Sequence, residues 1–217
     1  MKYTGQFLWP PRPEVAQAPT LMHAFEQQGW WAQAKMNGNC LLLGISPSGE
    51  IFPYTRHGTE PTRWRPGESC RELSQWLVGK GWHVFVGELL HTAGPHGEAI
   101  KDTIYIFDIL VAEDEYLVGV SHKTRQEKLA KVLAWPFTVY ADSWRSPTWT
   151  HKQIMPGIWL AKNHSGHFRQ LWDNPPGQYV EGLVFKNPDT RLKLCSSKSA
   201  NSAGMAKCRY ATNELAY

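Results

Sequence analysis

Alternating and apolar runs of strand length dominate the chain, and turn residues separate them. Residues 30–54 predict two or three β-strands, broken at Asn37-Gly38 and at Pro47-Ser48-Gly49. Short apolar runs predict further strands, at residues 83–91, 103–111, 157–161, 179–186, 191–195 and 205–210. The proline-rich start, WPPRPEVAQAP, predicts extended backbone, and the polar run SSKSANSAG predicts a surface loop.

Segments between these strands carry helix signals. Thr20 is expected to cap a short amphipathic helix that ends at Gly29. Ser69-Cys70-Arg71-Glu72 matches a capping box and predicts a helix over residues 69–78. KTRQEKLAKVLA, at residues 123–134, predicts a third helix, and HFRQLW predicts a fourth. Strands with interspersed helices indicate an α+β fold with antiparallel sheets.

At 217 residues the chain fits one large domain or two small ones with a substantial core, and a single domain over residues 1–217 is the expectation. No apolar run is long enough for a membrane span and no cleavable signal pattern is present, so neither a membrane nor secretion is indicated. The four scattered cysteines form no C-x-x-C pair and favour reduced thiols in a cytoplasmic compartment. A net charge of +4 permits a polyanionic partner without requiring one.

Several charged residues interrupt strand-like sequence, and together they are the strongest functional signal in the chain. They are Lys35, Arg56, Glu88, Glu181, Lys186 and Lys207. Each has an ordinary explanation when taken singly, because a lysine at a strand end can extend to water and charges on edge strands oppose aggregation. For Lys35 that explanation is a surface lysine before a hairpin turn at Asn37-Gly38. Their occurrence together favours a shared site.

In order and spacing these residues resemble the sequence elements of the covalent nucleotidyltransferases, which comprise ATP-dependent polynucleotide ligases and, more distantly, mRNA capping enzymes. The matching elements are Lys35-Met36-Asn37-Gly38, Arg56-His57-Gly58, Gly87-Glu88-Leu89, Ile106-Phe107-Asp108-Ile109, Glu181 to Lys186, and Ala206-Lys207-Cys208-Arg209. Any one element is weak, whereas all of them in order are a strong match. The segments GELLH, YIFDILV and the one containing Arg125 are most similar to phage-type ATP-dependent DNA ligases.

The resemblance implies an ATP-grasp-like nucleotidyltransferase domain with antiparallel β-sheets flanked by helices. It also implies a DNA ligase that seals nicks between 5′-phosphate and 3′-hydroxyl ends through a lysyl-AMP intermediate. ATP and Mg²⁺ (or Mn²⁺) are then the expected cofactors, and nicked duplex nucleic acid, with DNA favoured, is the expected partner of a cytoplasmic monomer in a bacterial or phage-infected cell. Two alternatives stay open: an RNA or RNA/DNA-hybrid ligase, and a module that binds nucleotides or nucleic-acid ends without turnover.

The resemblance assigns the reaction at phosphorus to the lysines and one glutamate. Lys35 would attack the α-phosphorus of ATP, and an amine attacks only when it is neutral, which cationic neighbours favour. Lys186 and Lys207 would stabilise the negative charge that develops on the phosphate. Glu181 would supply an oxygen to the metal, through water.

The nucleoside of ATP would be bound by a second group of residues. Arg56 and Glu88 would bind the ribose hydroxyls, as the resemblance implies. Phe107 would stack on adenine. The amide of Gln33, two residues before the nucleophile, would contact the edge of the base. Together with the lysines, these residues define an expected ATP site.

The sequence departs from the ligase pattern at several positions. Asn37 stands where the ligases usually have Asp, and Asn39 stands where they usually have Arg, which puts the placement of the 5′-phosphate in question. Arg209 replaces the second lysine of the last element and keeps its charge without its geometry. The chain ends soon after that element, so the expectation is a domain without the C-terminal OB-fold domain of the family.

A ligase of this length would grip the duplex through phosphate contacts on one face of the domain. The candidates for these contacts are Arg12, Arg63, Arg65, Lys198 and Arg209. Trp64 and Trp144 are candidate stacking surfaces for nucleic acid. For each of these residues, an ordinary solvated surface position is the alternative.

Overall fold

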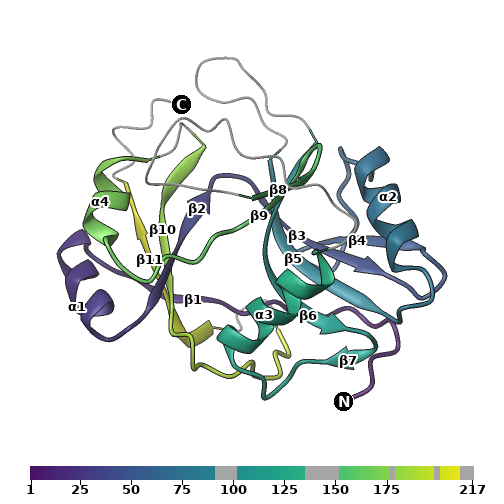
Figure 1. The fold of residues 1–217 in the computed structure, drawn as a ribbon, viewed down its shortest axis with the longest axis horizontal. Coiled ribbons are helices and arrows are strands. Elements are labelled where there is room, and N and C mark those ends of the chain that lie inside the picture. The colour runs from purple at the N-terminus through teal and green to yellow at the C-terminus, as the bar shows by residue number, and fades with distance from the viewer. Residues whose placement is uncertain (91–101, 135–151, 176–178, 198–200, 211–217) are drawn as a thin grey trace.

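Two β-sheets frame the cavity that contains most of the charged residues singled out above. A computed structural model of the chain describes residues 1–90, 102–134, 152–175, 179–197 and 201–210 (Figure 1). Helices α1 and α4 lie beside the smaller sheet, and α2 lies beside the larger one (Figure 1). The expected α+β class is confirmed. No helix in the described part of the chain is long and apolar enough to cross a membrane.

The larger sheet has the strand order β4-β3-β5-β6-β9-β8, and β7 pairs with β6. Its strands are β3 (Asn39–Ile45), β4 (Ile51–Thr55), β5 (His83–Leu90), β6 (Thr103–Ala112), β7 (Glu115–Tyr116), β8 (Lys152–Met155) and β9 (Ile158–Leu160). The central strands β3, β5 and β6 are apolar on both faces because α2 and α3 cover one face and the other faces the cavity side. They therefore hold the cavity floor rigidly.

The smaller sheet has the order β1-β11-β10-β2. Its strands are β1 (Arg12–Ala16), β2 (Trp31–Met36), β10 (Val180–Lys186) and β11 (Asn201–Arg209). Most strand pairs are antiparallel, as expected, and two are parallel: β1 with β11 and β6 with β9. The N-terminal strand closes this sheet on the side where its proline-rich segment reaches the cavity.

The Asn37-Gly38 step joins the two sheets and makes no hairpin. β2 pairs with β10, whereas β3 pairs with β4 and β5, so the chain changes sheets between Met36 and Asn39. A Cβ atom on Gly38 would lie 2.5 Å from the carbonyl oxygen of Leu89. The glycine is therefore required by the close approach of its backbone to β5, and not by a tight turn.

The helices in the described residues are α1 (Met22–Gln27), α2 (Glu68–Leu77), α3 (His122–Val132) and α4 (Phe168–Asp173), with a 3₁₀ turn at Pro19–Leu21. Two expected caps are wrong. Thr20 falls inside the 3₁₀ turn, which Pro19 starts with its fixed φ. α2 begins after Gly67, with Ser69 already in its first turn and no side-chain capping bond.

Two predictions near the C-terminal end of the described chain are also wrong. Residues 191–195 form only a single bridge, between Ser121 and Arg191, because Leu192 exchanges its backbone hydrogen bonds with the turn at Gly119 and Val120. The predicted loop over residues 196–204 is partly strand, since β11 begins at Asn201. Pairing of Asn201 and Ser202 with β1 overrides the low β-propensity of this polar segment.

Candidate active site

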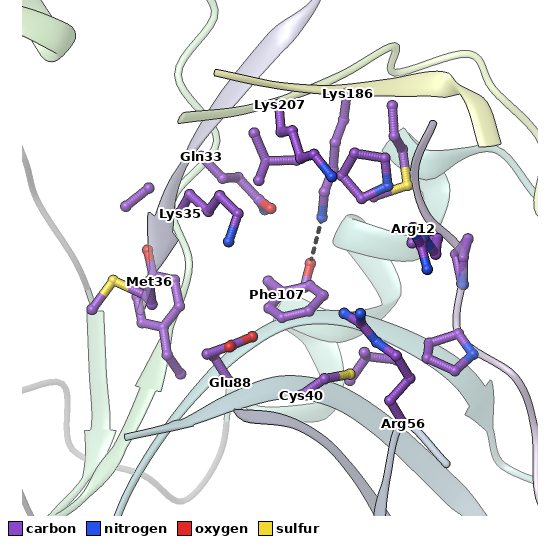
Figure 2. A pocket seen from close by; sticks show the side chains of 18 of the residues that line it. Arg12, Gln33, Lys35, Met36, Cys40, Arg56, Glu88, Phe107, Lys186 and Lys207 are labelled. Carbon is purple, nitrogen blue, oxygen red and sulfur yellow. Dashed lines mark hydrogen bonds between the residues drawn. The ribbon is translucent and has the colours of Figure 1, made fainter. Parts of the chain in front are cut away.

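A cavity between the two sheets is lined by residues from seven strands, β1, β2, β3, β5, β6, β10 and β11, and from the proline-rich segment before β1 (Figure 2). The residues predicted for nucleotide chemistry that line it are Gln33, Lys35, Arg56, Glu88, Phe107, Lys186 and Lys207. Arg12 and Arg209, which were predicted to contact nucleic acid, line the same cavity. Figure 2 shows the lysines entering from the smaller sheet, opposite Glu88 and Arg56, with the Phe107 ring between them.

Strand register explains why residues distant in the sequence form one row on the cavity wall. Gln33 and Lys35 are two apart on β2, so their side chains share a face. Val184 on β10 pairs with Gln33 on one side and with Lys207 on the other. The three residues therefore stand side by side across the smaller sheet.

Glu181 reaches this wall through a β-bulge. Val180 pairs with Met36 and Gly182 pairs with Lys35, so Glu181 is the extra residue on β10. Its carboxylate accepts a hydrogen bond from Lys35 Nζ and forms an ion pair with it. Arg209 Nη2 lies 3.5 Å from the same carboxylate oxygen. In this structure, Arg209 is thus a partner of Glu181.

Glycine at position 182 is required by the same bulge. Its φ is +144°, and a Cβ atom there would lie 2.0 Å from the carbonyl oxygen of Cys208. Any side chain would push β11 away and displace Lys207 from the wall. The Glu-Gly pair in the sequence thus has a local physical cause.

Glu88 enters the cavity from β5, next to the sheet-switching segment. Burial raises the pKa of Glu88 to about 7, with Glu181 acting in the same direction, while Lys35, Arg56 and the N–H of Gly38 act against it. Burial likewise raises the pKa of the Cys40 thiol, which neighbours Glu88 and Arg56, to about 11. Glu88 therefore exchanges its proton near neutral pH, and it can both donate and accept a hydrogen bond there.

Lys186 is 3% exposed and lies beneath the cavity, next to Phe107. Its Nζ donates to the Phe107 carbonyl oxygen at 3.3 Å and lies 4.9 Å from the centre of the ring. Burial lowers the pKa of Lys186 to about 8, and Arg125 lowers it further, whereas Asp108 raises it. The ammonium is thus poorly solvated, which strengthens its attraction to an anion in the cavity.

Lys207 faces a dense group of cations. The pKa of Lys207 is lowered first by burial and then by Arg209, Arg12, Lys35 and Arg56. Mutual repulsion of this kind is relieved when a polyanion binds among the side chains. The cavity wall formed by β2 and β11 is therefore suited to phosphate groups.

A buried ion pair behind the cavity was not singled out from the sequence. Arg125 on α3 binds Asp108 through two hydrogen bonds, Nε to Oδ1 at 3.0 Å and Nη2 to Oδ2 at 2.9 Å. Burial alone would raise the pKa of Asp108, but Arg125 holds it well below its ordinary value. The pair ties α3 to β6 directly behind Phe107. An acidic residue inside the apolar run of β6 was the signal that could have found it.

The residues predicted to contact nucleic acid outside the cavity differ in their exposure and hydrogen bonding. Arg65 Nη1 donates to the carbonyl oxygens of Pro61 and Trp64, and Arg63 is exposed. The prediction of Trp64 as a stacking surface is wrong, because its side chain is buried in the core at 4% exposure. Lys198 and Trp144 lie outside the described residues.

Solved structures with the same fold include DNA ligases. The ligase domain of LigD from Mycobacterium tuberculosis has a TM-score of 0.62 and 16% identity, covering 92% of this chain and 60% of that one. Mycobacterial DNA ligase D complexed with ATP has a TM-score of 0.59 and 18% identity, with the same coverage. The ATP-dependent DNA ligase of bacteriophage T7, in complex with ATP, has a TM-score of 0.55 and 13% identity, covering 93% and 68%.

At these identities the agreement is one of fold, and the chain has the fold of the nucleotidyltransferase domain of ATP-dependent DNA ligases. It spans about 60% of the length of the LigD structures. No protein-family model matches the sequence, and no curated protein sequence matches it. The expected domain class is thus confirmed through the fold.

Proposed function

We propose that this chain is the catalytic domain of an ATP-dependent DNA ligase. The observation that carries the proposal is the position of Lys35 Nζ: it faces a cavity with Lys186 and Lys207, in a domain of ligase fold. Three ammonium groups on one wall fit a triphosphate. The ATP named in the two ligase complexes supports the choice of nucleotide.

In the first step the neutral amine of Lys35 attacks the α-phosphorus of ATP. A bond forms between Nζ and phosphorus, the bond from the α-phosphorus to the bridging oxygen breaks, and pyrophosphate leaves. Glu181, which accepts a hydrogen bond from Nζ, is the nearest group to take the amine proton. Lys207 and Lys186 stabilise charge on the phosphate oxygens.

The nucleoside would lie between the sheets. Phe107 is the ring available for stacking on adenine, and Glu88 and Arg56 stand together at the far side for the ribose hydroxyls. A half-protonated Glu88 suits a diol, whose hydroxyls both donate and accept. Gln33 is buried on β2 and lines the cavity, a position that suits contact with the base edge.

The donor set fits Mg²⁺ held jointly by protein and substrate. The described residues contain no group of three metal-ligating side chains, and Mg²⁺ typically binds one or two carboxylates together with substrate phosphates and waters. Glu181 is the carboxylate in place for this. When bound, Mg²⁺ supplies positive charge to the phosphate oxygens.

In the second and third steps the AMP moves from Lys35 to a 5′-phosphate, and a 3′-hydroxyl then displaces AMP as the phosphodiester forms. Nicked duplex DNA is the proposed substrate, because the similar structures are named as DNA ligases. Arg12, Arg63, Arg65, Lys198 and Arg209 are the proposed contacts to it, with the protein acting as a monomer.

The test is covalent labelling by ATP carrying a labelled α-phosphate, with Mg²⁺, followed by denaturing electrophoresis and a nick-sealing assay. The wild type should retain the label, and Lys35→Ala should lose it while unfolding at the same temperature. Lys131→Ala, which removes an exposed lysine in the last turn of α3, is the matched control and should label normally. Labelling of Lys35→Ala at the wild-type level would refute the assignment, and binding of ATP without labelling of the wild type would favour a module without turnover.

A further inference from the structure

A line of three side-chain amides connects the cavity wall to the carbonyl oxygen of Phe107. Gln33 Nε2 donates to Asn163 Oδ1 at 2.9 Å. Asn163 Nδ2 donates to Gln126 Oε1 at 3.0 Å, and Gln126 Nε2 donates to the Phe107 oxygen at 3.1 Å. The line crosses from β2, through the segment after β9 and helix α3, to β6.

The direction of these hydrogen bonds is fixed at one end. A backbone carbonyl can only accept, so Gln126 must turn its NH₂ group to Phe107. Its oxygen then faces Asn163, which must donate to it and so turns its own oxygen to Gln33. Reversing any one amide would bring two donors or two acceptors together inside the protein, which is costly.

Backbone bonds hold the middle of the line in place. Ala32 N–H donates to the His164 carbonyl at 2.8 Å, and His164 N–H donates to the Ala32 carbonyl at 2.9 Å. This bridge fixes Asn163 beside Gln33, because Asn163 comes directly before His164 and Gln33 comes directly after Ala32 on β2. Lys186 Nζ donates to the same Phe107 oxygen as Gln126 does, so that oxygen is occupied from both sides.

The line of amides determines the orientation of the Gln33 side chain. With its NH₂ group committed to Asn163, its oxygen is the part left for the cavity, and Figure 2 shows that oxygen on the cavity side. We propose that Asn163 and Gln126 are positioning residues that make Gln33 a hydrogen-bond acceptor and thereby select purines with an amino group at position 6. The inference rests on the proposed function, because it takes the cavity to be the nucleotide site.

Four nucleotides separate the contribution of position 6 from the rest of the base. ATP and 2,6-diaminopurine riboside triphosphate carry an amino group there, whereas ITP and GTP carry a carbonyl oxygen that would face the Gln33 oxygen. Within each pair, one nucleotide has an amino group at position 2 (the 2,6-diaminopurine nucleotide and GTP) and the other lacks it (ATP and ITP). The wild type should label with both 6-amino nucleotides and at least about tenfold more slowly with both 6-oxo nucleotides.

Gln126→Leu and Asn163→Leu each cut the line at a different point and free the Gln33 amide to rotate. The ratio of ATP to ITP labelling rates should fall at least about fivefold in both variants. Gln75→Leu is the matched control, since it replaces an exposed glutamine on helix α2, and it should keep the wild-type ratio. A purely structural effect would slow both nucleotides equally and leave the ratio unchanged.

The inference fails if the wild type labels equally with ATP and ITP. It also fails if Gln126→Leu and Asn163→Leu both keep the wild-type ratio of ATP to ITP labelling rates. Equilibrium dialysis with ATP and ITP repeats the comparison without the covalent step. Absence of labelling with retained preference for ATP in dialysis would refute the ligase proposal and support the base selection. Labelling of the wild type without a preference for ATP over ITP would support the ligase proposal and refute the base selection.

Discussion

Glu181 accepts a hydrogen bond from Lys35 although the two residues are 146 positions apart in the chain. The β-bulge in β10 is what brings the carboxylate to the lysine. Because Arg209 also contacts this carboxylate, two cations hold Glu181. Its replacement is therefore a sensitive test of the reaction at phosphorus.

Glu181→Gln should slow labelling by ATP by about a hundredfold or more, because the amide keeps the shape but neither takes a proton nor ligates a metal well. Single-turnover labelling rates at saturating ATP measure the effect. Glu60→Gln, at an exposed position, should label at the wild-type rate. A Glu181→Gln rate within threefold of the wild type would remove Glu181 from the mechanism.

Glu88 should make the stability of the protein depend on pH. Its folded-state pKa of about 7 lies above the ordinary value of 4.5, so the folded protein binds more protons than the unfolded chain between these values. The free energy of unfolding should therefore fall as pH rises from about 4.5 to 7, by about 1–3 kcal/mol from this group.

Glu88→Gln removes that titration. Urea unfolding at pH 5 and pH 8 should show that the variant gains stability relative to the wild type only at pH 8. Glu60→Gln serves again as the control, and its free energy of unfolding should differ from that of the wild type by the same amount at pH 5 and pH 8. Equal effects of Glu88→Gln at the two pH values would contradict a raised pKa.

Arg125→Met should destabilise the fold by about 3–5 kcal/mol, because it leaves the buried carboxylate of Asp108 without its partner. The double variant Asp108→Leu/Arg125→Met should recover part of the loss, since no unpaired charge stays buried. Arg169→Met breaks an exposed ion pair with Asp173 and should have no measurable effect. Urea midpoints measure all three, and a single variant no worse than the double one would exclude the pairing argument.

Salt concentration should affect nick sealing and self-adenylation differently. Nick sealing by the wild type should fall steeply between roughly 50 and 200 mM salt, because each neutralised DNA phosphate releases counterions. Self-adenylation involves no duplex and should fall much less over that range. Arg63→Ala, at an exposed site, should lower the salt slope of sealing alone. Equal slopes for both steps would argue against an electrostatic grip on this face.

The sequence predicted the charged residues of the cavity, most of them because a charge inside an apolar strand is costly unless it has a function. Lys35, Lys186 and Glu88 were found in this way, and the structure brings them to one cavity. Their catalytic and binding roles stay predictions. The α+β class followed from the same runs of apolar residues.

What could not be predicted depends on distant contacts. Asn163 and Gln126 are ordinary polar residues in their own segments, and only the folded chain lines them up. Residues 191–195 alternate Leu with Arg and Lys as a half-buried strand does, but they pair with no strand among the described residues. Trp64 looked available for stacking because its neighbours are polar, yet it fills the core.

The change of sheets at Asn37-Gly38 makes the spacing between the lysine and the opposite sheet a property of the main chain. Lys35 ends the cavity-facing row on β2, and Cys40, five residues later, already pairs with Glu88. One residue of extended chain adds about 3.5 Å, whereas a misplacement of about 1 Å can cost a hundredfold in rate. The chain between Lys35 and Cys40 thus sets the distance from the Lys35 amine to Glu88, the proposed ribose contact. The length of this segment admits substitution far more readily than insertion or deletion.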